Sequence, residues 1–217
     1  MGERFPVKTG RILVPVLFLA AFGVVLVRNA WLSDDAYITL RVVDNLVHGY
    51  GLVWNVGERV QVYTHPLWMA LFAGAYALTR EVFLTAHLLS LVLSLAAVGV
   101  VVMGIARSVA GSLLAGAALI LSKAFVDYAA CGLENPLTYL LYGLFLLLYL
   151  RRTPDHRPLL SLSLLAALGM TNRTDTLFLF LPPLAAALAE AGRPGRGRAA
   201  ALGATPLLAW ELFSLFY

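Results

Sequence analysis

Charged residues are scarce in this sequence. They make up 13% of its 217 residues, and 60% of the chain is hydrophobic. Soluble domains carry about 25% charged residues. A chain with so little charge cannot cover a surface that faces water on all sides. The composition therefore excludes a soluble domain and predicts a protein that crosses a membrane several times.

Several common functional signatures are missing as well. Cys131 is the only cysteine, which excludes an intramolecular disulfide framework. The chain has neither a Walker nor a Rossmann glycine pattern, and its net charge of +4 does not indicate a nucleic-acid partner. The histidines lack the spacing of a metal site: they are His48, His65, His87 and His156. No cofactor is therefore expected, with a divalent cation at the carboxylates kept as an alternative.

Long apolar runs make up most of the chain, and a helix needs roughly 20 such residues to cross the hydrocarbon core. The runs expected to cross are Ile12 to Ala30, Val82 to Ala106, Val109 to Tyr128, Pro136 to Leu150, Pro158 to Met170 and Leu177 to Ala191, with another span beginning at Ala199. This pattern predicts an all-α, polytopic membrane helix bundle, with residues 1–217 as one module. The last apolar run has no polar flank, which indicates either a truncated chain or one that ends against the membrane.

The polar stretch at residues 31–81 separates the first two spans. Asp34 and Asp35 open a segment to Val47 in which apolar residues recur at helical spacing, and this predicts an amphipathic helix in the membrane interface. Residues 52–63 are expected to be extended or a strand, with a turn at residues 55–57. The apolar run from Pro66 to Leu78 is short for a span, so we predict a second interfacial helix.

Basic residues predict the orientation of the bundle. If the run from Pro66 to Leu78 does not cross, Arg107 and the basic loops at 151–157 and 193–198 share the N-terminal side. The positive-inside bias makes that side cytoplasmic. The first loop then lies outside, together with residues 131–135 (CGLEN) and 171–175 (TNRTD). We therefore expect Asp34, Asp35 and Glu134 to line one external cavity.

Each polar cluster on that side has a functional and a structural interpretation. Paired carboxylates such as Asp34 and Asp35 can supply a general base, because one charge raises the pKa of the other. Such a pair is equally often a solvated helix cap. Glu134 is either a site carboxylate at membrane depth or a loop residue before a helix. Arg173 and Asp175 predict a phosphate-binding cation or a structural ion pair. Further candidates for substrate binding are Tyr37, Arg59 and His65.

The stretch at residues 34–68, DDAYITLRVVDNLVHGYGLVWNVGERVQVYTHPLW, resembles a known family. It is similar to integral-membrane GT-C glycosyltransferases that use polyprenyl-phosphate-linked sugars. Within these it is most like the actinobacterial terminal arabinofuranosyltransferases, which share a D-D-x-x-I…N-L…G-x-G-x-V-x-N-x-G-E-R-V pattern. GLENP and TNRTD carry the resemblance more weakly. It implies a GT-C bundle with interfacial juxtamembrane helices in the first external loop.

The same resemblance implies roles for individual residues. Asp34 or Asp35 would be the catalytic base, and Glu134 a further carboxylate of the site. A basic residue before the second interfacial helix contacts the lipid phosphate in related aminoarabinose transferases, but His65 occupies that position here. The expected donor is a polyprenyl-phosphate-linked sugar, with a pentofuranose as one candidate. The expected acceptor is a glycan or lipid in cell-wall biosynthesis at the cell membrane.

Two other functions fit the same residues. A transporter or flippase for a lipid-linked or small polar substrate would also place carboxylates and an arginine in a membrane cavity. A non-catalytic membrane subunit would need neither. Transporters favour broken helices near the midplane and repeated halves. Here the polar clusters gather at one face and no repeat is visible, which favours chemistry at the interface.

Overall fold

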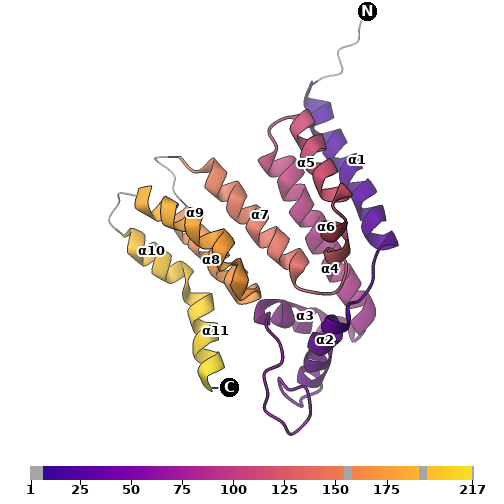
Figure 1. Ribbon diagram of the computed structural model, residues 1–217, viewed down its shortest axis with the longest axis vertical. Helices are drawn as coiled ribbons and strands as arrows, with labels where there is room; N and C mark the ends of the chain where they lie inside the picture. Colours follow the sequence, from indigo (N-terminus) through magenta and orange to yellow (C-terminus); the bar gives the residue numbers. More distant parts are fainter. Residues whose placement is uncertain (1–6, 154–157, 191–194, 217) are drawn as a thin grey trace, which may run out of the picture.

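A computed structural model describes residues 7–153, 158–190 and 195–216 of the chain (Figure 1). Every regular element in these ranges is a helix, which confirms the all-α prediction. In order they are α1 (Val7–Arg28), α2 (Asp34–Val47), α3 (Pro66–Thr79), α4 (Val82–Gly99), the π-helix η1 (Val100–Ile105), α5 (Val109–Leu121), α6 (Lys123–Tyr128), α7 (Asn135–Arg151), α8 (Leu159–Asn172), the 3₁₀-helix η2 (Thr174–Thr176), α9 (Leu177–Glu190), α10 (Arg196–Gly203) and α11 (Thr205–Phe216).

The longer helices run between two ends of a bundle (Figure 1). The start of α1, the end of η1, the end of α7 and the start of α10 lie at one end. The opposite end holds α2, α3, the start of α7 and the connection from α8 to α9. The loop at 32–65 and the described part of the basic turn, residues 195–198, therefore lie at opposite ends, as the sequence predicts. Residues 154–157 and 191–194 of the basic loops lie outside the described residues.

Among the described residues, one helical stretch is long and apolar enough to cross a membrane, Val82–Ile105 with 24 residues. The pair α10 and α11 qualifies only if it is counted as one span, and it is bent by 48°. Shorter apolar helices occur at Ile12–Arg28, Pro66–Thr79, Val109–Leu121 and Leu159–Asn172. The other expected spans therefore stay predictions.

Two of the expected continuous runs are broken by capping residues or proline. The run from Val109 to Tyr128 divides at Ser122, whose hydroxyl accepts the Phe125 N–H (3.3 Å) and so caps α6. The final run bends between α10 and α11, just before Pro206, because proline cannot donate into the preceding turn. The helix α1 begins at Val7, ahead of the apolar run expected from Ile12, and its apolar part is Ile12–Arg28.

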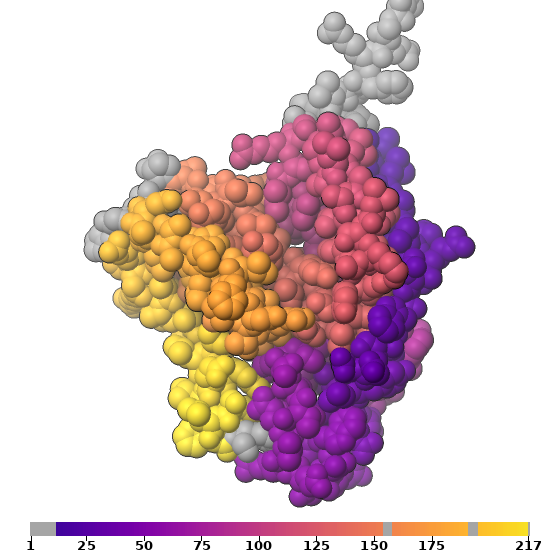
Figure 2. All heavy atoms as spheres, viewed as in Figure 1, coloured from indigo at the N-terminus to yellow at the C-terminus, as the bar shows by residue number. Residues whose placement is uncertain are grey.

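The first loop folds as a compact unit of α2 and α3 across the lower end of the bundle (Figures 1 and 2). α2 buries Ala36, Leu40 and Val43, as its apolar spacing predicts, and α3 buries Trp68 and Phe72. Figure 1 shows α3 lying across the ends of the long helices rather than alongside them. Residues 52–63 form no strand; they are irregular, with the predicted turn closed by the Glu58 N–H on the Asn55 carbonyl (3.1 Å).

Candidate active site

A cavity of about 650 Å³ opens at the end of the bundle that carries α2 and α3. Four segments that are distant in the sequence form its wall: the first turns of α2, the residues before α3, the turn before α7 and the connection from α8 to α9. Its charged or titratable lining residues include Asp35, His65, Glu134, Arg173 and Asp175. The helix arrangement thus brings three predicted polar clusters to one place.

Hydrogen bonds to its backbone carbonyl hold Glu134 in place, in addition to the contacts of its side chain. Its carbonyl accepts hydrogen bonds from the Thr138 N–H (3.1 Å) and from Asn172 Nδ2 (3.1 Å). Asn172 Nδ2 also donates to Thr138 Oγ1 (2.9 Å), which ties the end of α8 to the first turn of α7. Pro136 begins α7 in the first helical turn, where its missing N–H costs nothing.

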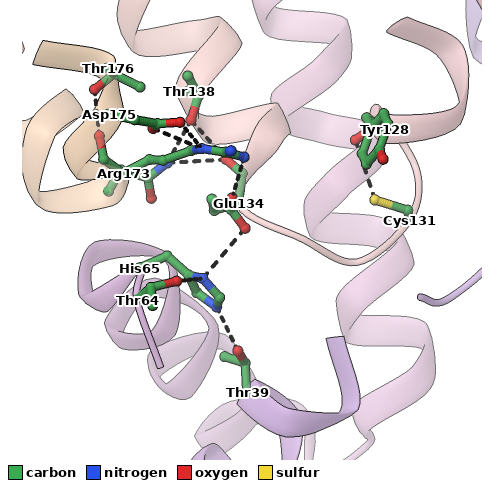
Figure 3. Close-up of polar contacts among 11 residues, drawn as sticks. Thr39, Thr64, His65, Tyr128, Cys131, Glu134, Thr138, Arg173, Asp175 and Thr176 are labelled. Atoms are coloured by element: carbon green, nitrogen blue, oxygen red, sulfur yellow. Dashed lines mark hydrogen bonds and ion pairs between the residues drawn. The ribbon is translucent and has the colours of Figure 1, made fainter. Parts of the chain in front are cut away.

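The Glu134 carboxylate is divided between two partners (Figure 3). Its Oε1 accepts from Arg173 Nη1 at 3.0 Å, and its Oε2 lies 3.5 Å from His65 Nδ1. Glu134 is only 6% exposed. A buried carboxylate is costly unless it is paired, and here Arg173 supplies the opposite charge. The geometry therefore makes Glu134 a group that orients its neighbours.

His65 is buried between α2 and Glu134, and its ring nitrogens face different partners. Nε2 lies 2.5 Å from Thr39 Oγ1, and Nδ1 faces Glu134 and the Thr64 hydroxyl (3.4 Å). Burial lowers the pKa of His65; the Glu134 carboxylate opposes this shift and Arg173 adds to it. A neutral ring with its proton on Nδ1, accepting from the Thr39 hydroxyl, fits all three neighbours. Burial and these contacts together favour the neutral ring.

Arg173 is the charged cation of the cavity. Its Nε donates to both carboxylate oxygens of Asp175 (2.9 and 3.1 Å), while Nη1 binds Glu134. The Asp175 hydrogen bond is the largest cause that raises the Arg173 pKa, while burial opposes the rise. Nη2 has no protein partner within the described ranges, and the side chain is 45% exposed. Two carboxylates therefore orient the guanidinium and leave one edge open to a ligand.

The acidic pair at the start of α2 is split by the helix geometry. Asp35 lines the cavity, whereas Asp34 does not, so the expectation that both acids line it is wrong for Asp34. Asp34 Oδ1 instead accepts the Asp35 N–H (3.0 Å) at the N-terminus of α2. Ser33 is the N-cap residue but makes no side-chain cap hydrogen bond, so the Asp34 carboxylate supplies the side-chain acceptor for an N–H in the first turn of α2.

Two expected substrate-binding residues lie away from the cavity wall. Tyr37 is 53% exposed and is not a lining residue. Arg59 Nη2 donates to the Phe216 carbonyl (3.2 Å) at the end of α11 and does not line the cavity. By contrast Thr39, Thr138 and Asn172 hold the site and were not expected. Thr39 follows Asp35 by one helical turn, so the spacing alone could have identified it.

The acids, histidines and cysteine of the described ranges do not assemble into a metal site. No group of three or more of these side chains is placed to hold a metal ion there. Two of the three cavity carboxylates, Glu134 and Asp175, are instead bound to Arg173.

The chain resembles two curated proteins over part of its length. It is 33% identical over 128 residues to the terminal β-(1→2)-arabinofuranosyltransferase of Mycobacterium tuberculosis, covering 54% of this chain and 20% of that protein. It is 55% identical over 38 residues to the enzyme of the same name from Corynebacterium glutamicum, covering 18% of this chain and 6% of that protein. No family model and no solved structure matches the chain. The sequence similarity is thus to glycosyltransferases, and it spans a minor part of their length.

Proposed function

We propose that this chain acts as a multi-pass membrane glycosyltransferase of the GT-C type. In this proposal it transfers a sugar from a polyprenyl-phosphate donor to a hydroxyl of a glycan or lipid acceptor outside the cell. The observation that carries the proposal is the cavity in which Asp35, Glu134 and Arg173 meet. The partial similarity to terminal β-(1→2)-arabinofuranosyltransferases supports the reaction class and makes a pentofuranose the first sugar to test.

Asp35 is the general base in this mechanism. It is the exposed cavity acid for which the structure shows no basic side-chain partner among the described residues, whereas Glu134 and Asp175 both bind Arg173. Its carboxylate removes the proton of the acceptor hydroxyl as that oxygen attacks the anomeric carbon. The bond from the anomeric carbon to the phosphate oxygen breaks, and the lipid phosphate leaves with both electrons of that bond.

Arg173 meets the charge that develops on the leaving phosphate. Its open Nη2 edge is preorganised by two carboxylates, and a fixed donor aimed at developing charge is an effective catalyst. Three carboxylates line the cavity against this one guanidinium, and burial lowers the pKa of His65, which favours its neutral form. That balance favours a donor with one phosphate charge over a diphosphate, which supports a monophosphate-linked sugar.

The placement of the cavity supports a reaction on the outer side of the cell membrane. The cavity lies at the end of the bundle opposite Arg107, Arg151 and the start of α10 (Figure 1). With the basic end cytoplasmic, the N-terminus is cytoplasmic and the cavity faces the donor headgroup at the external surface.

The test compares the two adjacent acids in the complete protein. We expect Asp35→Asn to lower the rate of transfer from polyprenyl-phosphate-linked arabinofuranose by about 10²–10⁴-fold, the usual contribution of a general base. Asp34→Asn serves as the matched control, because it removes one charge at the adjacent position outside the cavity, and we expect a change within about threefold. Equal rates for wild type and Asp35→Asn would refute the assignment, and no transfer by the wild type would refute the donor class.

A further inference from the structure

A second cavity, of about 390 Å³, lies at the opposite end of the bundle. It forms where η1, the connection to α5 and the last turn of α7 meet, and it shares no lining residue with the candidate active site. The proposed glycosyl transfer does not use it. Any ligand it binds is therefore separate from the sugar donor and acceptor.

The charge of this cavity is entirely positive. Arg107 and Arg151 line it, and no Asp or Glu from the described ranges does. Arg151 Nη2 donates to the Gly104 carbonyl (2.8 Å), which fixes the guanidinium without neutralising it. Arg107 has no ion-pair or hydrogen-bond partner in the described part of the chain. Two guanidinium groups beside one hollow repel each other, and an anion between them would relieve that repulsion.

Arg152, next to Arg151 in the sequence, does have an acidic partner at this end of the bundle. Arg152 forms an ion pair with Glu190 (3.2 Å), and its guanidinium lies 3.6 Å from the ring centroid of Tyr149. The residue directly before it, Arg151, lines the cavity and has no such partner. Arg151 and Arg152 are adjacent in the sequence, yet among the described residues only Arg152 is paired with an acid.

Apolar side chains continue from the cavity along α5. Met103 lines the cavity and is 50% exposed, and Leu113 and Leu114 on α5 are 48% and 73% exposed. A soluble phosphate would not contact these groups, whereas an acyl chain would cover them. Basic pockets between helices on the cytoplasmic side of membrane proteins suit anionic lipid headgroups.

We propose that Arg107 and Arg151 bind the phosphate of an anionic phospholipid of the cytoplasmic leaflet, with its acyl chains along α5. The orientation comes from the proposed membrane topology, but the proposal does not require the transfer reaction. The phosphate oxygens would accept from both guanidinium groups, whose forked donors match phosphate geometry. The cavity thus fixes one annular lipid at the end of the bundle away from the active site.

Lipid retention by the complete protein tests this proposal. Native mass spectrometry would compare phosphatidylglycerol with phosphatidylcholine of the same acyl chains, without any sugar donor. We expect the wild type to prefer phosphatidylglycerol, and the double variant Arg107→Gln/Arg151→Gln to lose about tenfold or more of that preference. Arg28→Gln, at the other end of the bundle, is the matched control and should keep the preference.

A charge-conserving variant separates loss of binding from loss of folding. The double variant Arg107→Lys/Arg151→Lys keeps both positive charges but loses the forked donors, so it should retain more of the preference for phosphatidylglycerol than the double Gln variant and less than the wild type. Equal retention of the two lipids by the wild type, or an unchanged preference in the double Gln variant, would overturn the proposal. Displacement of phosphatidylglycerol by millimolar inorganic phosphate would also overturn it, because the site would then bind free phosphate.

Discussion

Both ends of the bundle carry arginines, but the two ends compensate their charge differently. At the active-site end, Arg173 is bound by Glu134 and Asp175. At the other end, Arg107 and Arg151 line a cavity with no acid among the described residues. Partners that are already present orient a charge and limit how much further anionic charge it attracts. A charge without such partners attracts anions but is oriented less firmly. The paired arginine at one end is suited to positioning a ligand phosphate, and the arginines at the other end, unpaired with any acid of the described ranges, are suited to binding an anion.

In this comparison of the two ends, the largest expected effect comes from removing the oriented cation, Arg173. We expect Arg173→Gln to lower sugar transfer by about 10²–10³-fold, because that is the usual cost of losing one donor to developing negative charge. The measurement is the transfer rate of the complete protein at saturating donor. Arg152→Gln is the matched control: it also loses a carboxylate partner, but at the opposite end.

We expect Arg152→Gln to change transfer by less than about twofold and to cost at most about 1 kcal/mol of stability, as is usual for an exposed ion pair. If both variants lost activity equally, the contrast between the two ends would not hold. The loss would then reflect a general effect of removing an arginine.

A smaller effect is expected when a glycine at each end is replaced by alanine: the two variants should differ in their loss of folding stability. Gly132 has φ +80°, and an added Cβ would lie 2.5 Å from Leu32 Cδ2. Gly104 lines the other cavity, and its added Cβ would lie 3.3 Å from the tip of Leu147. We expect Gly132→Ala to destabilise by about 1–3 kcal/mol and Gly104→Ala by less than about 1 kcal/mol. Apparent unfolding midpoints at one scan rate would measure both; a larger loss for Gly104→Ala would contradict the strain assigned to the turn before Glu134.

The smallest effect is a dependence of stability on pH that should arise at the active-site end. Burial lowers the pKa of His65 in the folded protein, with Glu134 and Arg173 as its charged neighbours. The unfolded chain therefore binds the proton more readily below pH 6.5. Stability from this group is complete above that pH and declines as the pH falls through it.

Melting between pH 7.5 and about pH 5.5 would measure that decline. We expect His65→Gln to have a flatter profile than the wild type, because it removes the buried titrating ring. His48→Gln, an exposed histidine at the end of α2, is the matched control and should keep the wild-type profile. Identical profiles for all three proteins would mean that His65 is not held in its neutral form by the fold.

The meeting of distant polar clusters could be predicted from the sequence because it follows from topology. Pro66 starts α3 and Pro136 lies in the first turn of α7, the part of a helix that tolerates proline. With the run from Pro66 treated as interfacial, residues 131–135 and 171–175 had to join the first loop at one end. That argument needs only the number of helices and their directions, and both can be inferred from the apolar runs of the sequence.

The individual contacts could not be predicted, because they depend on small rotations and on pairings far apart in the chain. Adjacent residues of a helix point in different directions, so Asp35 lines the cavity while the Asp34 carboxylate accepts an N–H in the first turn of α2. Thr39 and His65 are 26 residues apart, and Arg59 reaches a carbonyl 157 residues away. The break at Ser122 arises because a local cap competes with a continuous apolar run.

The position of Pro66 directly after His65 couples the active site to the docking of a whole helix. His65 is the residue before the first turn of α3, and Trp68 anchors that helix through a fully buried side chain. The backbone before proline is stiff, so the imidazole moves with the helix rather than independently. A shift of α3 by about one ångström would already break contacts of this length. The contacts of His65 in the cavity therefore persist only while α3 keeps its position across the bundle, so we expect displacement of α3 to abolish the proposed transfer.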